Sequence, residues 1–277
     1  MPFYPDGMPF STLATSSPIV GQDEGQLGGT MRLLLVNPNM TGAMTDRMAG
    51  IARDVASPGT EIVPLTAGRG FPYIASRAEA QIGGALACEM IADHAEGADA
   101  AIIAAFGDPG LAGARELFDL PVVGMAEAAL VSAAMLGERI SIVTFSPVMR
   151  RWYLDSVRDA GLSARFAGVR TPDGHASDLG NVQHSLREDL IRLCNRAVRE
   201  DGADVVVLGG APLAGLAPEI RGEVEAPVVD PISAATLQAQ ALAVLAPQAG
   251  FAGRASKPLP KTATGLPPAL TRQFACG

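Results

Sequence analysis

Polar residues follow several apolar runs of this chain, at points where a strand would end. Asn37 and Asn39 follow the first run, and their side-chain amides can both donate and accept hydrogen bonds. Amides beside a helix start could hold an anion or a carbonyl oxygen. The alternative is a plain turn in which Thr41 caps the helix. Thr144 follows another run, and its hydroxyl would lie at the same kind of strand end.

The loop AAFGDPG (104–110) carries the candidate base Asp108. Asp108 could take a proton or anchor a polar group, with Ala105, Phe106 and Gly107 lining a pocket beside it. Glycine at 107 would let the backbone approach a ligand closely. The alternative is that Asp108 caps a helix that Pro109 starts.

A second loop, GGAPLAG (209–215), has no ionisable side chain. It could therefore offer only backbone N–H groups and shape, which suit a carboxylate or a developing enolate oxygen. A tight strand-to-helix turn explains the same residues. The candidate binding residues in this loop are Gly209, Gly210, Ala211 and Pro212.

Two histidines lie in the polar segment 171–185. His184 is a candidate catalytic group, and with His175 and nearby aspartates it could contribute to a metal site, since imidazole and carboxylate are suitable ligands. Their spacing matches no recognised ligand pattern, so we expect no cofactor and leave a metal open. Tyr73 could close over a pocket or pack within its own loop.

The elements that must position these residues are short strands alternating with helices. Near-continuous apolar strands separated by helices indicate a parallel sheet covered on both faces, which is the α/β class. We expect strands at 32–37, 60–65, 100–106, 121–124, 139–144, 165–169, 204–209 and 227–230. We expect helices at about 42–56, 76–96, 110–118, 126–136, 147–160, 182–201, 215–223 and 232–246.

An internal repeat relates residues 99–129 to residues 204–235. The repeat predicts two pseudo-symmetric lobes, each a parallel sheet flanked by helices, with the strand ends of both facing one active-site cleft. We expect a flexible extension at 1–30, lobe one at 31–125 and 233–277, and lobe two at 126–232.

Composition limits the possible partners. The chain has 277 residues, 48% of them hydrophobic, and a net charge of −8, which argues against binding to nucleic acid or an anionic membrane surface. No apolar run approaches the length of a membrane span. Three cysteines without ligand spacing fit a reducing compartment, so we expect a cytoplasmic protein with a small-molecule substrate.

Several ordered motifs resemble the aspartate/glutamate racemase superfamily, specifically its hydantoin and allantoin racemase branch. They are NPNMTGAMT, AAFGDPGLAGARELFDLPVVGMAEAA, GERISIVTFS and the PVVD segment, and the resemblance spans about residues 31–270. It implies two pseudo-symmetric α/β lobes with the active site between them. Members are often oligomeric, so the alanine-rich helices here could pack against a second subunit.

The resemblance implies two catalytic cysteines, one at a strand end in each lobe. One takes the α-proton and the other returns a proton to the opposite face of an enolate-like intermediate. The matching positions in this chain are Ala105 and Gly210, so both cysteines are absent. Cys88 and Cys194 lie within predicted helices and are expected to be buried core thiols.

Neither alanine nor glycine can transfer a proton, so two-thiol racemisation should not operate here. One hypothesis is a family enzyme that acts next to a carbonyl of a cyclic ureide or small carboxylic acid, using Asp108, a histidine, Tyr73 or water. Hydrolysis, decarboxylation or elimination would suit the lost thiols, and arylmalonate decarboxylases of the superfamily keep only one cysteine. The other hypothesis is a binding protein that retains the cleft without chemistry.

Overall fold

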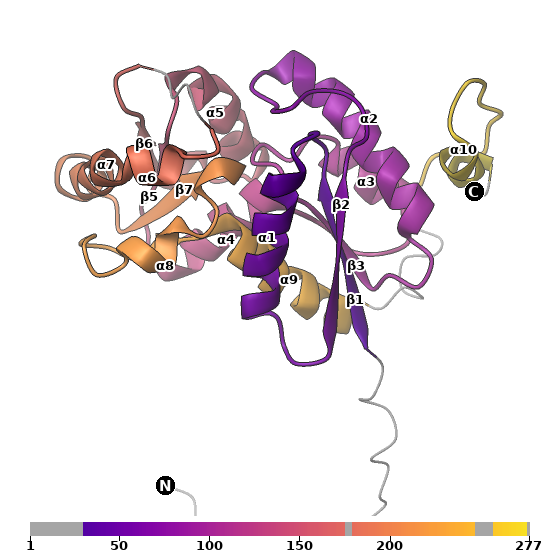
Figure 1. Ribbon diagram of the computed structural model, residues 1–277, viewed down its shortest axis with the longest axis horizontal. Helices are drawn as coiled ribbons and strands as arrows, with labels where there is room; N and C mark the ends of the chain where they lie inside the picture. The colour runs from indigo at the N-terminus through magenta and orange to yellow at the C-terminus, as the bar shows by residue number, and fades with distance from the viewer. Residues whose placement is uncertain (1–29, 175–178, 247–256, 276–277) are drawn as a thin grey trace, which may run out of the picture.

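Two parallel sheets form the centre of the molecule (Figure 1). The computed structural model describes residues 30–174, 179–246 and 257–275, so nearly all of the predicted extension at 1–30 lies outside the described residues. The first sheet contains β1 (Met31–Asn37), β2 (Thr60–Thr66), β3 (Ala100–Ile103) and β4 (Val122–Gly124). The second contains β5 (Ile140–Thr144), β6 (Phe166–Arg170), β7 (Val205–Gly209) and β8 (Val228–Val229).

The two sheets have the same topology. The strand order is β2-β1-β3-β4 in the first and β6-β5-β7-β8 in the second, and all neighbouring strands are parallel. The central strands β3, β5 and β7 are buried along their whole length, as their near-continuous apolar sequences predict, and the buried polar residues of β5 are Ser141 and Thr144. The predicted α/β fold with two pseudo-symmetric lobes is therefore confirmed.

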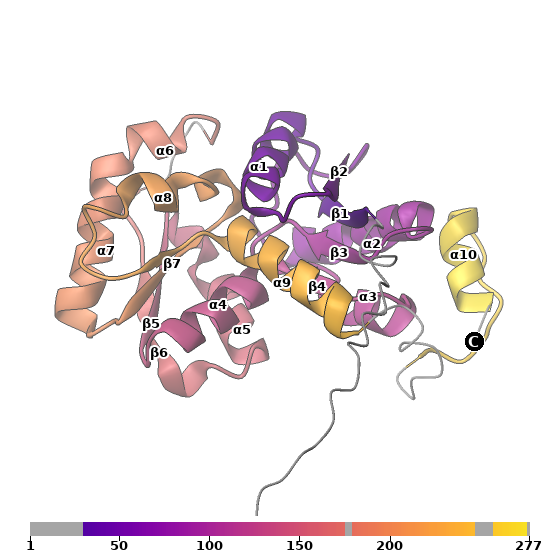
Figure 2. The ribbon, with the colours of Figure 1, turned by 90° about the horizontal axis from the view of Figure 1, so that it is seen from below.

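Helices cover the sheets and join the lobes (Figure 2). The helix α4 (Met125–Leu136) follows the first sheet and packs on β7, while α9 (Pro231–Leu245) returns to pack on β3 and β4. The helices of the first lobe are α1 (Gly42–Val55), α2 (Arg77–His94), α3 (Leu111–Leu117), α9 (Pro231–Leu245) and α10 (Pro268–Ala275). Those of the second are α4 (Met125–Leu136), α5 (Arg150–Asp159), α6 (Val182–Ser185), α7 (Arg187–Asp201) and α8 (Leu216–Ile220).

One hydrophobic cluster runs through both lobes. It joins strand residues such as Ile102 of the first sheet and Val207 of the second through the buried alanines of α4 and α9. Alanine at these positions lets the two helices lie close together, and they pack directly on each other. The lobes therefore share a core, although each has its own sheet.

Some element bounds differ from the sequence-based expectation. The strand expected at 100–106 ends at Ile103, because the backbone turns and the Asp108 N–H donates to the Ala105 carbonyl. The helix expected at 182–201 is divided into α6 and α7 at Leu186, whose φ of −112° and ψ of 10° are not helical. The C-terminal helix α10 was not expected.

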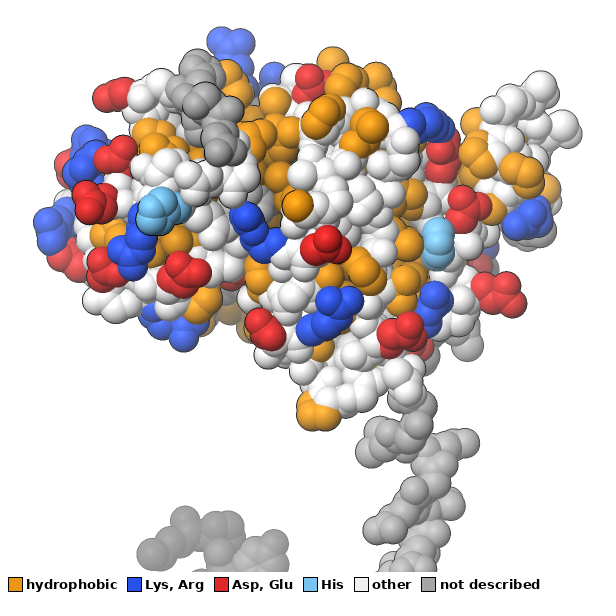
Figure 3. Space-filling view, viewed as in Figure 1, with side chains coloured by type: hydrophobic (Ala, Val, Ile, Leu, Met, Phe, Trp, Pro, Cys, Tyr) orange, Lys and Arg blue, Asp and Glu red, His pale blue; other side chains and the backbone are white. Residues whose placement is uncertain are grey.

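The surface of lobe two carries charges of both signs (Figure 3). On α7, Arg187 pairs with Glu223, Arg196 with Glu200, and Arg199 with Glu225. In the described part of the chain, no helix is long and apolar enough to cross a membrane.

Two glycines allow α2 to contact the loop between β3 and α3. A Cβ on Gly84 would lie 2.8 Å from the backbone nitrogen of Gly110, which itself has a φ of 82°. We expect Gly84→Ala to lower the free energy of unfolding by about 1–3 kcal/mol, because rigid backbone cannot move aside as a side chain can. Gly50→Ala in α1 is the matched control, since nothing lies within 4 Å of its added Cβ.

The control should raise the free energy of unfolding by up to about 1 kcal/mol, the usual preference for alanine within a helix. Urea denaturation of both variants measures the difference. Equal effects of the two substitutions would show that the contact between Gly84 and Gly110 has no special role in stability.

Candidate active site between the lobes

A small cavity lies where loops of the two lobes meet. Its volume is about 10 Å³, and Ala105 of lobe one and Gly210 of lobe two both line it. A volume of this size holds at most about one water molecule. The lobes must therefore separate, or side chains must move, before a small organic molecule can enter. The cavity is lined by Asn39, Tyr73, Ile74, Ala105, Phe106, Trp152, Tyr153, Gly210 and Ala211.

The Tyr153 side chain of α5 occupies the space beside Gly210. A Cβ built on Gly210 would lie 3.2 Å from the Tyr153 hydroxyl oxygen and 2.8 Å from the Phe145 ring. Gly210 has a φ of 117°, which also favours glycine. The Tyr153 ring packs edge-on against Phe106, with ring centroids 4.6 Å apart. Aromatic groups thus fill the lobe-two wall of the cavity.

The hydroxyls of Tyr153 and Thr144 are both buried, and neither makes a hydrogen bond to a described residue. Burial raises the pKa of Tyr153 above its usual range, although the neighbouring hydroxyls of Thr144 and Tyr73 lower it. Burial, and next the Tyr153 phenol, raise the pKa of Tyr73 as well. Both phenols therefore keep their protons at neutral pH.

Asn37 and Asn39 form a buried polar network after β1. The Asn37 amide nitrogen donates to Asn39 Oδ1 at 3.1 Å and to Thr45 Oγ1 at 2.9 Å. Thr41 N–H donates to Asn39 Oδ1 at 3.0 Å, so both amides shape this turn. Asn37 supports Asn39, whose amide nitrogen points to the weak acceptor Sδ of Met44 at 3.7 Å. Asn39 is the amide of this pair that lines the cavity.

Asp108 caps a helix, but not the one expected from the sequence. The helix α3 begins at Leu111 after Gly110, whereas the Asp108 carboxylate accepts N–H bonds from Ala126 at 2.7 Å and Glu127 at 2.8 Å, at the start of α4. Its φ of 50° turns it toward that helix. Burial raises the pKa of Asp108 to about 7, and the two N–H groups oppose this rise.

The second lobe has a corresponding cap with the carboxylate at a different position. Asp230, at the start of α9, accepts from Ser233 N–H at 2.9 Å and from Gly215 N–H at 2.6 Å. The repeat-equivalent position in lobe one is Gly124, where a Cβ would overlap the Asp108 carboxyl group. One carboxylate therefore binds the start of the helix that follows each sheet. For α4 it is Asp108, from the loop after β3, and for α9 it is Asp230, which directly follows β8.

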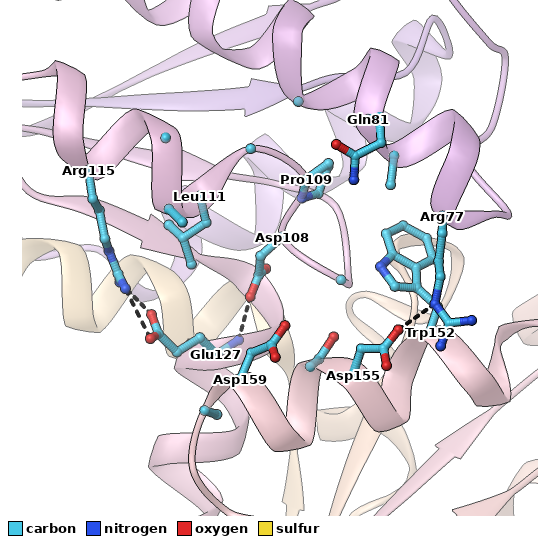
Figure 4. Close-up of a pocket in the computed structure, with 18 of the residues that line it drawn as sticks. Arg77, Gln81, Asp108, Pro109, Leu111, Arg115, Glu127, Trp152, Asp155 and Asp159 are labelled. Atoms are coloured by element: carbon cyan, nitrogen blue, oxygen red, sulfur yellow. Dashed lines mark hydrogen bonds and ion pairs between the residues drawn. The ribbon is translucent and has the colours of Figure 1, made fainter. Parts of the chain in front are cut away.

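A larger groove of about 700 Å³ lies outside the cavity, between α2, α3 and α5 (Figure 4). Trp152 lines both spaces, and a Cβ on Gly107 would overlap its indole ring. Across this groove, Arg77 of lobe one pairs with Asp155 of lobe two at 2.5 Å. Trp152 therefore separates the groove from the cavity, and the ion pair bridges the two lobes beside it.

Comparisons with known proteins give the family. A family model described as Asp/Glu/hydantoin racemase matches residues 33–239. A hydantoin racemase of Paenarthrobacter aurescens is 36% identical over 237 residues, which cover 83% of this chain and 99% of the relative. This chain belongs to the Asp/Glu/hydantoin racemase family.

Solved structures agree with this assignment. Allantoin racemase from Klebsiella pneumoniae superposes with a TM-score of 0.79 at 35% identity, covering 85% of this chain and 96% of that one. Arylmalonate decarboxylase shares the fold, with a TM-score of 0.55 at 18% identity, covering 76% of this chain and 92% of that one. The chain is thus a member of a family of racemase and isomerase enzymes.

Other candidate groups of this family member lie away from the cavity. His184 is exposed on α6, Cys88 lines the outer groove, and Cys194 is buried in lobe two. Burial raises the pKa of Cys88 to about 11 and that of Cys194 to about 12, so neither thiol is ionised at neutral pH. Cys276 and His175 lie outside the described residues. Among the described residues, no group of three or more His, Cys, Asp or Glu side chains could hold a metal ion.

The remaining predicted binding residues lie around the cavity without lining it. Gly107 borders the outer groove, and Thr144 lies next to Tyr153. A Cβ on Gly209 would lie 2.9 Å from the Tyr153 ring, and the Pro212 carbonyl accepts from Gln183 at 2.8 Å.

Sequence reasoning missed three lining residues, which are Ile74, Trp152 and Tyr153. The last two are adjacent aromatics in a chain with only 5% aromatic residues, a signal that could have drawn attention to them.

The raised pKa of Asp108 predicts a pH dependence of stability. Its folded pKa of about 7 exceeds the ordinary value of 3.8, so between these values the folded chain retains a proton that the unfolded chain has lost. The free energy of unfolding should therefore fall with rising pH in this window, by up to about 1.4 kcal/mol per unit. Asp108→Asn should remove this part of the slope.

Urea denaturation of wild type and Asp108→Asn from pH 4 to 8 measures the difference at each pH. Asparagine tolerates a positive φ, so the loop can keep its conformation. Parallel curves for the two proteins would mean that the N–H bonds at α4 keep the carboxylate ionised throughout.

Proposed function

We propose that this chain is a cytoplasmic enzyme that acts on the carbon next to a carbonyl of a cyclic ureide or a small carboxylic acid, by a mechanism that does not use two thiols. The observation that carries the proposal is the meeting of Ala105 and Gly210 at one cavity. They come from equivalent loops of the two lobes, at the positions where the family resemblance places the catalytic cysteines. The proposed site therefore lies where the family resemblance implies it, with Ala105 and Gly210 at the positions of the two cysteines.

The groups at the cavity support chemistry rather than binding alone. Asn39 could donate its amide to a carbonyl or enolate oxygen, because its described acceptor is a weak thioether. Tyr73 and Tyr153 carry exchangeable protons at the same cavity. By contrast, both carboxylate oxygens of Asp108 are bonded to the start of α4. The phenols are therefore better placed than Asp108 or His184 for proton transfer to a bound molecule.

A substrate panel tests the proposal. The wild type is incubated in D2O with 5-substituted hydantoins, allantoin and 2-substituted malonates, and products are followed by chiral chromatography and mass spectrometry. We expect turnover of at least one of these compound classes, since each has its reacting carbon next to a carbonyl. The Cys88→Ser/Cys194→Ser double variant should keep the wild-type rate, because both thiols lie away from the cavity. Binding without turnover across the whole panel would favour a binding protein instead.

A second pair of variants locates the reaction. Ala105→Leu should reduce turnover at least about 100-fold by filling the space needed for the substrate. Ala241→Leu, on the exposed face of α9, adds the same atoms away from the cavity and should leave the rate unchanged. Equal rates for both variants would place the reaction somewhere other than this cavity.

A further inference from the structure

The Tyr153 hydroxyl lies where a side chain at position 210 would enter the cavity. It is 3.2 Å from a Cβ built on Gly210, so it approaches the cavity from the lobe-two side. The lobe-one side presents the methyl group of Ala105 and the ring of Phe106. Directly opposite Gly210, the proton-bearing group is therefore Tyr153 of lobe two, while Tyr73 and Asn39 of lobe one line the cavity elsewhere.

The same hydroxyl is buried without a hydrogen-bond partner among the described residues. A buried unpaired hydroxyl destabilises the fold, and phenylalanine would fill the same space without that penalty. The polar atom is therefore more useful to a bound molecule than to the packing of α5.

We propose that Tyr153 is the catalytic proton donor of this site, delivering one proton from the Gly210 side to a carbanion formed by loss of CO2. This inference rests on the proposed function and narrows its substrate class to acids that carry a carboxylate on the carbon next to a second carbonyl group.

The choice of CO2 loss follows from what the cavity lacks among its described lining residues. Removal of a proton from carbon needs a base, and the lining side chains include no carboxylate, imidazole or thiol. The two phenols stay protonated because burial raises their pKa values. Such groups can give a proton to a strongly basic carbanion but cannot readily create one. A carbanion can still arise when the group that leaves is CO2 rather than a proton.

The proposed step balances as follows. The bond between the α-carbon and the departing carboxylate breaks, its electron pair moves into the remaining carbonyl, and CO2 leaves. Asn39 donates its amide to the enolate oxygen, and the α-carbon then takes the phenolic proton of Tyr153. The phenolate regains a proton from water through Tyr73, which is partly exposed and lies next to Tyr153. Apolar walls disfavour the charged carboxylate and so favour its loss.

The test uses two probes with the full-length protein in D2O: 2-methyl-2-phenylmalonate, which is prochiral, and racemic 5-methylhydantoin-5-carboxylate. The wild type should release CO2 and form one enantiomer with a single deuterium at the α-carbon. Tyr153→Phe should lose at least about 100-fold in product formation, and its residual product should be racemic, because water then protonates both faces. Tyr73→Phe is the matched control, which should slow turnover but keep the single enantiomer.

The stereochemical readout separates catalysis from folding. Tyr153→Phe keeps the ring contact with Phe106, and its thermal midpoint should equal or exceed that of wild type because the hydroxyl has no described partner. A Tyr153→Phe variant that keeps both the rate and the single enantiomer would overturn the inference. Turnover of the earlier panel without CO2 release from either probe would overturn it and leave the proposed function intact. If the protein turned over neither the panel nor the two probes, both this inference and the proposed function would be wrong.

Discussion

The two hydrogen bonds between the Asp108 carboxylate and the start of α4 link the loop beside the cavity to the helix that joins the two sheets. Asp108 lies three residues after Ala105, and α4 is the helix by which the chain leaves the first sheet for the second. The cap therefore fixes the loop that carries Ala105 relative to the connection between the lobes. Asp230 performs the corresponding task at α9, where the chain returns to the first lobe.

These two caps explain how the repeat can preserve a fold while its residues diverge. A carboxylate is needed at each helix start because several N–H groups there have no partner within the helix. The carboxylate can come from the loop after the third strand of a lobe or from the end of its fourth strand. Where one position supplies it, the other must be small, as Gly124 shows beside Asp108. The cavity-facing residues next to these loops are then free to change.

Much of the fold could be predicted from the sequence, because the buried parallel strands have near-continuous apolar runs and the repeat links the two halves. The positions of Ala105 and Gly210 at one cavity also followed from that repeat and from the family resemblance. The hydrogen-bond partners of Asp108 could not be predicted. An Asp-Pro pair is typical of a helix that starts at the proline, and nothing in the sequence shows that the carboxylate instead accepts from N–H groups at the start of α4. Tyr153 was missed because it lies within a helix rather than at a strand end, and helical spacing alone does not tell which lobe an aromatic ring faces.

Trp152 stands between the outer groove and the cavity, and it is the single tryptophan of the chain. Trp152 is 7% exposed, and it lines the outer groove together with Arg77 and Asp155, whose ion pair bridges the lobes. The intrinsic fluorescence of this protein therefore originates at the boundary that a small molecule must cross. Emission wavelength and quenching by solutes report on the wetting of that boundary without any attached label.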